Sequence, residues 1–246
     1  MIRPQAVRYG GEPIVVKAGS FLARPINLAD PQEVCTFQEL RYEYFVRRKS
    51  WACPDPLAPY CETDRYDAFA HHLAAFETTD ETIQEKQNQK IVIYLRALPW
   101  HEHVGFMLDH EFRCLLSDEE HADLHRTNAV ELSRLVIAPG ACSKSANQDG
   151  TGERPRHVIE LLLKLLYHLS LEQQIEHYYI VVEKHWLPAF TRRFHIPFKV
   201  IGREYTFPDG TVTVAAHATR TELEQAMAAK DSQKFLWYQQ RDAKQP

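Results

Sequence analysis

Residues 129–138 read AVELSRLVIA, and the prediction of the fold starts from this stretch. Its aliphatic and β-branched side chains are typical of a buried strand. Glu131 and Arg134 lie inside it, although a buried charge is costly unless it is paired and hydrogen-bonded. Strand alternation puts Glu131 and Ser133 on one face and Arg134 on the other. We therefore do not expect Glu131 and Arg134 to pair with each other unless the strand bulges.

Further elements follow on both sides of this strand. Upstream, the pattern predicts strands at residues 14–17, 21–26, 71–76, 91–98 and 104–108, a helix at 31–49 after the N-cap Asp30, and a helix or loop at 115–125. Downstream, it predicts helices at residues 155–174, 187–194 and 221–230, a strand at 177–183, and a hairpin of 197–207 with 211–218 around Asp209-Gly210. This order indicates an α/β or α+β fold, in which a mixed sheet carries helices on both faces.

The totals limit the class of protein. The length suits one domain over residues 1–246, with a loose N-terminal arm at 1–20 and a C-terminal helix and tail at 219–246. The net charge of −4 argues against general nucleic-acid binding. We find no apolar segment typical of a signal peptide and no stretch near the ~18 apolar residues of a membrane span, so we expect a cytoplasmic protein. The 5 cysteines include no CxxC pair, so we expect free thiols and no metal site.

A second stretch, residues 41–67, reads RYEYFVRRKSWACPDPLAPYCETDRYD. Arg41 and Phe45 lie one turn apart on one face of the predicted helix. Trp51 stands where this helix gives way to a proline-rich loop. The loop is long for a compact domain, and such loops are usually functional or mobile.

The arginines that we expect in buried strands need carboxylate partners. Arg96 lies in the strand at residues 91–98 and Arg134 in the one at 129–138. Asp64 and Asp67, at the end of the loop, are the obvious candidates. The alternative remains open that such a network only pins the loop to the sheet. Glu131 is a candidate general base, because it is a strand carboxylate beside a hydroxyl group.

Two other patterns have plainer explanations. His121 and His125 have a spacing that suits a metal on a helix, but no third ligand is near in the sequence, so exposed histidines are the simpler interpretation. Gly150-Thr151-Gly152 before a helix would suit a phosphate with Arg154 and Arg156, although a flexible loop is the simpler interpretation. No P-loop, GxSxG or HExxH motif is present.

Taken together, these residues resemble the signature of the acyl-homoserine-lactone (autoinducer) synthase family of the GNAT superfamily. The family pattern is R-x3-F-x5-W, then D-x2-D, a strand arginine and E-x-S-R. The residues that fill it, called the signature residues from here on, are Arg41, Phe45, Trp51, Asp64, Asp67, Arg96, Glu131, Ser133 and Arg134. Related N-acyl amino acid synthases and exosortase-associated acyltransferases share the aspartates, the strand arginine and E-x-S-R.

The resemblance implies a fold and an activity. The fold would be a GNAT-like, mostly antiparallel twisted sheet, with helices on both faces and a splayed central strand pair. The activity would be transfer of a fatty acyl group from a thioester to the amine of a small amino-acid-like acceptor. With S-adenosylmethionine as acceptor, the product would be a lactone signal for bacterial quorum sensing. Glu131, Ser133 and Arg134 would be catalytic, whereas Arg41, Phe45, Trp51, Asp64, Asp67 and Arg96 would bind substrate.

The same resemblance implies the partners and leaves alternatives open. No cofactor is expected beyond the co-substrates, which are acyl carrier protein or acyl-CoA and, for a lactone synthase, S-adenosylmethionine. The pyrophosphate loop of GNAT enzymes is absent after Val136, which favours the carrier protein as donor. The glycine usual before Arg96 is missing, and Leu135 replaces a common phenylalanine. The alternatives are an N-acyl amino acid synthase and a non-catalytic GNAT-like binding or regulatory domain.

Overall fold

The structure is a computed structural model, which describes residues 14–51, 59–78, 89–141 and 154–240. These residues divide into two compact units. The first contains the described residues up to Arg96 together with Arg134–Tyr167. The second contains Ala97–Ser133 and the described residues from His168 onward. A single domain over residues 1–246 stays a prediction, and most of the expected N-terminal arm lies outside the described residues.

The first unit combines antiparallel strands with two long helices. Its elements are β1 (Val16–Ala18), β2 (Phe21–Pro25), α1 (Pro31–Arg41), a π-helix (Tyr42–Arg48), a 3₁₀ helix (Asp67–Phe69), β3 (His71–Glu77), most of β4 (Lys90–Pro99), the end of β5 (Ala129–Ile137) and most of α3 (Arg154–Glu172). The strand order is β1-β2-β3-β4, and β2 pairs antiparallel with both β1 and β3. The Ala138 N–H donates to the Val92 oxygen at 2.9 Å, which places the end of β5 beside β4.

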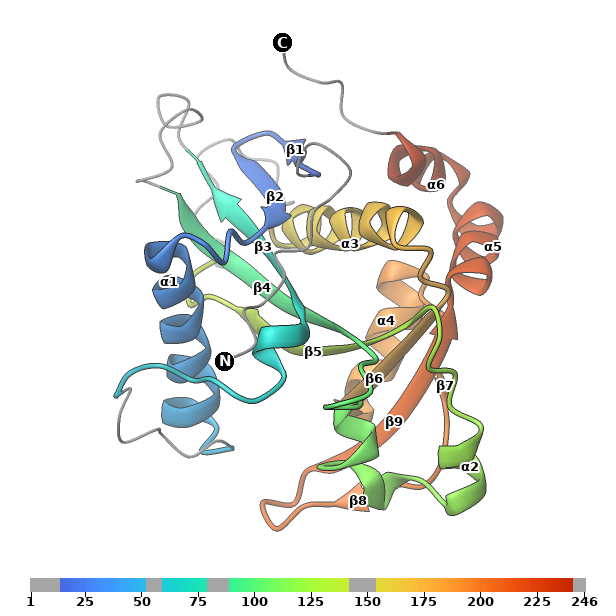
Figure 1. Cartoon of the computed structure of the whole chain (residues 1–246). Helices are drawn as coiled ribbons and strands as arrows, with labels where there is room; N and C mark the ends of the chain where they lie inside the picture. The colour runs from blue at the N-terminus through green and yellow to red at the C-terminus, as the bar shows by residue number, and fades with distance from the viewer. Residues whose placement is uncertain (1–13, 52–58, 79–88, 142–153, 241–246) are drawn as a thin grey trace. The chain divides into compact units, whose positions relative to one another are not determined.

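Helix α1 begins as the sequence predicts and continues in an unexpected form. The Asp30 side chain caps it, and Pro31 occupies the first turn. Its apolar residues pack on β2, β3 and β4 in a core that contains Leu22, Ile26, Val34, Phe37, Leu40, Ala74, Phe76, Ile91 and Tyr94. From Tyr42 the chain runs on as the π-helix, so that the two form one helical rod in Figure 1. The predicted α-helix at residues 31–49 is therefore correct only in its first part.

The second unit contains the remaining strands and the C-terminal helices. Its elements are two 3₁₀ helices (Met107–Asp109 and Arg113–Leu115), α2 (Asp118–Ala122), the start of β5, β6 (His177–Glu183), a 3₁₀ helix (Lys184–Trp186), α4 (Leu187–Phe194), β7 (Lys199–Val200), β8 (Tyr205–Thr206), β9 (Val212–Thr219), α5 (Arg220–Lys230) and α6 (Ser232–Gln239). The strand order is β5-β6-β9-β7, and β8 pairs with β9. Strand β6 pairs parallel with β5 and antiparallel with β9.

The pairing of β5 with β6 covers only the first part of each strand. The register runs from Ala129–His177 to Leu132–Ile180, although β5 continues to Ile137 and β6 to Glu183. Arg134 then takes a left-handed backbone conformation with φ 56°. This region is the one where the resemblance predicts that the central strands splay.

Two predicted elements need correction. The strand at residues 104–108 is wrong, because Gly105 has φ +62° and the 3₁₀ helix Met107–Asp109 follows it. The Asp109 carboxylate accepts the Phe106 N–H at 2.7 Å, which stabilises this tight turn. The C-terminal tail also contains α6, which the sequence pattern missed. The side chain of Asp231 accepts the Lys234 N–H at 3.0 Å and so caps this helix.

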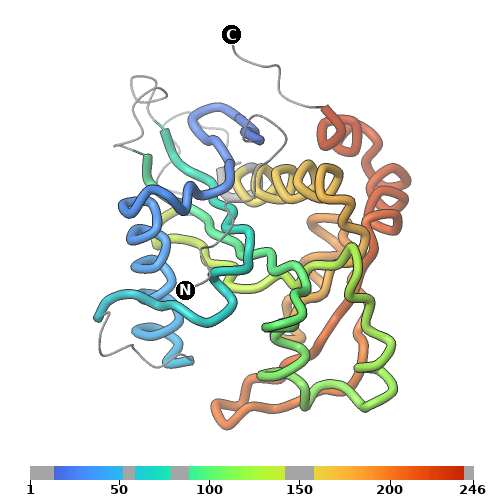
Figure 2. The backbone as a smooth tube through the Cα atoms, in the orientation of Figure 1, coloured from blue at the N-terminus to red at the C-terminus, as the bar shows by residue number. Residues whose placement is uncertain are grey.

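The hairpin predicted around Asp209-Gly210 is confirmed as the connection between β8 and β9, drawn in orange in Figure 2. Gly210 has φ +83° and open space around its Cα. Gly202 has φ +88°, but a Cβ there would collide with the Leu115 carbonyl oxygen. A side chain at Gly210 would therefore meet only backbone strain, whereas a side chain at Gly202 would meet backbone strain and lack of space.

We expect Gly202→Ala to lower the free energy of unfolding by roughly 2–5 kcal/mol, because strain and collision add. The matched variant Gly210→Ala carries strain alone and is expected to cost roughly 1–2 kcal/mol. Urea unfolding of both variants measures the difference. Equal losses would show that the contact with Leu115 relaxes without cost.

Candidate active site

Six charged side chains of the first unit form one arginine–carboxylate network: Arg41, Glu62, Asp64, Asp67, Arg96 and Arg134. Arg96 donates to Asp64 at 2.6 Å and to Asp67 at 2.7 Å. Arg134 donates to Asp64 at 3.0 Å. The predicted pairing of the strand arginines with the loop aspartates is thus confirmed as geometry, and the role of each residue stays a prediction.

Glu62 is the member of the network that the sequence reasoning missed. One of its oxygens faces Arg41 in a close ion pair, and the other accepts from Arg134 Nε at 3.1 Å and from a terminal nitrogen at 3.0 Å. The Glu62 N–H donates to the Gln38 oxygen at 3.2 Å, so the segment before β3 passes beside α1 at this point. The number of arginines could have predicted a third carboxylate, because the buried Arg41 and Arg96 and the partly buried Arg134 carry three positive charges against the two of Asp64 and Asp67.

Burial and charge decide the ionisation of this network. Arg41 and Arg96 have 0% exposure, which places both guanidinium groups away from water. Burial alone would favour the neutral carboxyl of Asp67, but the charges of Arg41 and Arg96 outweigh it and lower the pKa of Asp67 to about 2. Asp67 is therefore ionised at neutral pH, and the network is balanced, with three positive and three negative side chains.

Further hydrogen bonds from Tyr94, His72 and the Asp64 backbone hold the network in place. The Tyr94 hydroxyl lies 3.4 Å from Arg41 and 2.7 Å from His72 Nδ1. His72 Nε2 lies 2.9 Å from the Asp67 carbonyl oxygen. Asp67 also accepts the Asp64 N–H at 3.0 Å. His72 is therefore a hydrogen-bonded core histidine, and the Tyr94 hydroxyl links it to Arg41.

The signature aromatics lie against the network. The Arg134 guanidinium lies over the Phe45 ring at 5.2 Å, within cation–π range. The Phe45 and Trp51 rings stack at 6.1 Å, and Lys49 Nζ lies 4.8 Å from the Trp51 ring centre. Phe45 is buried, whereas Trp51 is 48% exposed. The π-helix sets this arrangement, since the Trp51 N–H donates to the Phe45 oxygen at 2.8 Å.

Glu131 and Ser133 belong to the second unit. Glu131 is 1% exposed and accepts the Met107 N–H at 2.6 Å and the Leu108 N–H at 3.3 Å. Ser133 is half-buried in the same strand. Two backbone donors stabilise the negative charge of Glu131 and fix its orientation.

Two histidines of the second unit that the sequence pattern singled out, His121 and His125, contact other side chains of the protein. His121 Nε2 lies 2.7 Å from Asp109, and the His125 ring stacks on His177 at 3.9 Å. The described residues contain no group of three metal-binding side chains that would hold an ion. Gly150-Thr151-Gly152 lies outside the described residues.

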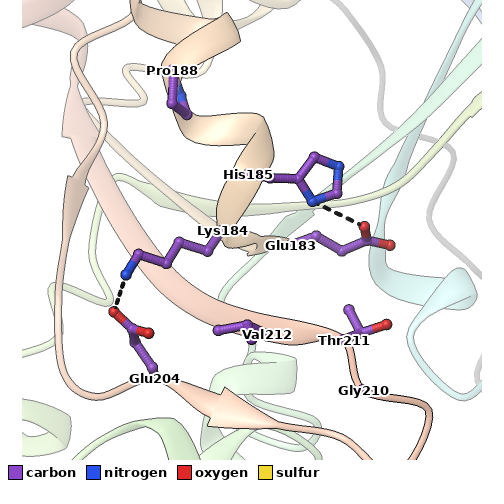
Figure 3. A pocket seen from close by; sticks show the side chains of 8 residues that line it. All are labelled: Glu183, Lys184, His185, Pro188, Glu204, Gly210, Thr211 and Val212. Atoms are coloured by element: carbon purple, nitrogen blue, oxygen red, sulfur yellow. Dashed lines mark hydrogen bonds and ion pairs between the residues drawn. The ribbon is translucent and has the colours of Figure 1, made fainter.

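The second unit contains a groove of about 600 Å³ (Figure 3). Its walls are Glu183, Lys184, His185, Pro188, Glu204, Gly210, Thr211 and Val212. Lys184 pairs with Glu204, and His185 lies 3.4 Å from Glu183. The charges of this groove are therefore paired in the protein, and no signature residue lines it.

The buried His71 makes stability depend on pH. Burial lowers the pKa of His71 to about 4, below the ~6.5 of an unfolded chain, so the folded protein keeps it neutral. The unfolded chain binds the proton first, and stability is lost as the pH falls from about 6.5 to 4, by on the order of 3 kcal/mol. We expect His71→Gln to flatten the pH dependence of the unfolding free energy in this window. The exposed His185→Gln is the control, and an equal change in both variants would contradict the assignment to His71.

Comparisons with known proteins support the same fold. Residues 40–148, which are 109 of the 246 residues, match the family described as acetyltransferase (GNAT) domain. The CoA-dependent acyl-homoserine lactone synthase BjaI, solved with SAM and isopentyl-CoA, has a TM-score of 0.60 at 18% identity over 89% of each chain. The acyl-homoserine lactone synthase LasI has a TM-score of 0.60 at 17% identity over 93% of this chain and all of its own (100%).

A third solved structure represents the other expected activity. FeeM, an N-acyl amino acid synthase from uncultured soil microbes, has a TM-score of 0.53 at 12% identity over 85% of this chain and 98% of its own. No curated protein matches the chain by sequence. The mixed, mostly antiparallel GNAT-like fold and the resemblance to these synthases are confirmed. Within the described part of the chain, no helix has the length and apolar character needed to cross a membrane.

Proposed function

We propose that this chain is an N-acyltransferase that moves a fatty acyl group from a thioester to the amine of an amino-acid-like acceptor. One observation carries the proposal: the signature residues of the first unit meet in a single cluster of ion pairs and aromatic rings. Such a cluster is costly to bury unless a function or a fold requires it. The GNAT-like fold supplies the scaffold on which the solved synthases are also built.

The chemistry requires a base. An α-amino group has a pKa of ~7.7–8.0, so much of it is protonated at neutral pH and cannot attack a thioester. Glu131 would remove this proton, directly or through water, and the nitrogen would then attack the carbonyl carbon. The thiol of the donor leaves as the amide forms. Ser133 lies beside Glu131 in the strand and would support this step.

The first candidate acceptor is S-adenosylmethionine, with an acyl-homoserine lactone as the product. Phe45 and Trp51 favour it, because the related N-acyl amino acid synthases keep the helix aromatics less faithfully. BjaI was solved with SAM, and that likeness supports the same choice. The second candidate is a free amino acid, supported by the likeness to FeeM. A chain without transfer activity would be a GNAT-like binding domain.

The donor would be a carrier-protein or CoA thioester in the bacterial cytoplasm. Exposed basic residues after α1 would suit the acidic surface of a carrier protein. Of these, Arg47 pairs with Glu43 at 2.8 Å, and Arg48 and Lys49 follow it in the chain. BjaI is CoA-dependent by its description, so both donors belong in the test.

Release of free thiol tests the proposal directly. The purified chain is mixed with acyl-CoA or acyl-carrier thioester, alone and with S-adenosylmethionine or a mixture of amino acids. We expect amine-dependent thiol release above the rate without amine. No release with any acceptor would remove both enzyme readings and leave the binding domain.

A further inference from the structure

Glu62 connects two arginines of the network through its two oxygens. Its side chain is only 3% exposed, and each oxygen faces one guanidinium group. Arg41 comes from the end of α1 and Arg134 from β5, whereas Glu62 comes from the segment before β3. The Glu62 N–H is also bound to the Gln38 oxygen of α1. This carboxylate therefore ties three separate parts of the first unit together.

Arg134 combines a strained backbone with a side chain that is bound by several partners. It has φ 56°, a left-handed conformation that costs a non-glycine residue free energy and persists where surrounding contacts hold it. Glu62 accepts two of the hydrogen bonds that the Arg134 guanidinium donates, and Asp64 accepts one. The same guanidinium lies over the Phe45 ring. Glu62 and Asp64 thus hold the Arg134 guanidinium group against the Phe45 ring.

We propose that Glu62 is a positioning residue that sets the affinity for the amine acceptor by orienting Arg134 over Phe45. This inference rests on the proposed acyltransferase function. Glu62 does not touch the substrate, because its side chain is buried and both oxygens are engaged with arginines. Its effect reaches the acceptor through Arg134 and Phe45. We expect the affinity for the donor thioester not to depend on Glu62.

The variant Glu62→Gln tests this role. The amide has one acceptor oxygen in place of two and presents an NH₂ group to one of the arginines. We expect KM for the acceptor to rise about 10- to 100-fold, which corresponds to the loss of a hydrogen bond to a charged group. KM for the thioester is expected to stay within about twofold. Glu43→Gln is the matched control, since it breaks an exposed pair with Arg47 in the same helical rod.

A second variant keeps the test open if Glu62→Gln does not fold. Glu62→Asp retains the charge but is one methylene shorter, so it reaches one arginine better than the other. We expect the same selective rise in acceptor KM, smaller than for Glu62→Gln. Equal changes in both KM values, or none relative to Glu43→Gln, would overturn the positioning role. An inactive wild-type chain would instead overturn the proposed function, which separates the two failures.

Discussion

Glu131→Gln is expected to lower kcat by about 100- to 10,000-fold while the protein stays folded. Glutamine has the shape of glutamate, and its oxygen can still accept the Met107 and Leu108 N–H groups. It cannot take a proton from the acceptor amine. The variant therefore removes the base and keeps the contacts that orient residue 131. Rates with saturating donor and acceptor, together with the thermal midpoint, measure both effects.

The matched control is Glu222→Gln in the same unit. The Glu222 carboxylate also accepts a backbone N–H, that of Thr219 at 3.0 Å, but it caps α5 and is no signature residue. We expect Glu222→Gln to keep wild-type kcat. Full activity in Glu131→Gln would remove Glu131 as the base and leave it as a structural acceptor of backbone N–H groups.

Arg96→Ala is expected to give the largest loss of stability, about 3–5 kcal/mol. Arg96 is buried and donates to Asp64 and Asp67, so its removal leaves three carboxylates facing two guanidinium groups. The pKa of Asp67 is low partly because of Arg96, and it should rise in the variant. Urea unfolding at pH 7 measures the loss.

An exposed arginine provides the comparison for Arg96. Arg47 pairs with Glu43 one turn away, and both side chains are largely exposed. Such exposed helix pairs contribute little to stability, so Arg47→Ala should change the unfolding free energy far less than Arg96→Ala. If Arg96→Ala cost as little as Arg47→Ala, the network would not stabilise the first unit.

The sequence predicted correctly those helices, strands and turns that have strong local sequence patterns. The helix at residues 187–194 and the strand at 177–183 have the predicted bounds, and the hairpin at Asp209-Gly210 is confirmed. The π-helix Tyr42–Arg48 was missed, because seven residues give too few apolar positions to separate its period from that of an α-helix. The strand at 104–108 failed because one short apolar run does not distinguish a strand from a tight turn.

For the site, the sequence predicted which charged residues pair, but not how many carboxylates the network contains. Asp64 and Asp67 were paired with the strand arginines because buried charges need partners. Glu62 was missed, because carboxylate partners were sought only for the strand arginines Arg96 and Arg134, whereas Arg41 in the helix also needs one. The left-handed backbone of Arg134 was also missed. The alternation of side chains describes a regular strand and does not indicate where the backbone departs from it.

Mass analysis of the product tests the central claim, that this chain joins an acyl group to an amine, most directly. The protein is incubated with an acyl-carrier or acyl-CoA thioester and with isotope-labelled S-adenosylmethionine or amino acids. We predict a labelled amide product whose mass contains both the acyl chain and the acceptor, as the lactone for S-adenosylmethionine. Both substrates recovered unchanged, with every donor and acceptor tried, would contradict the account.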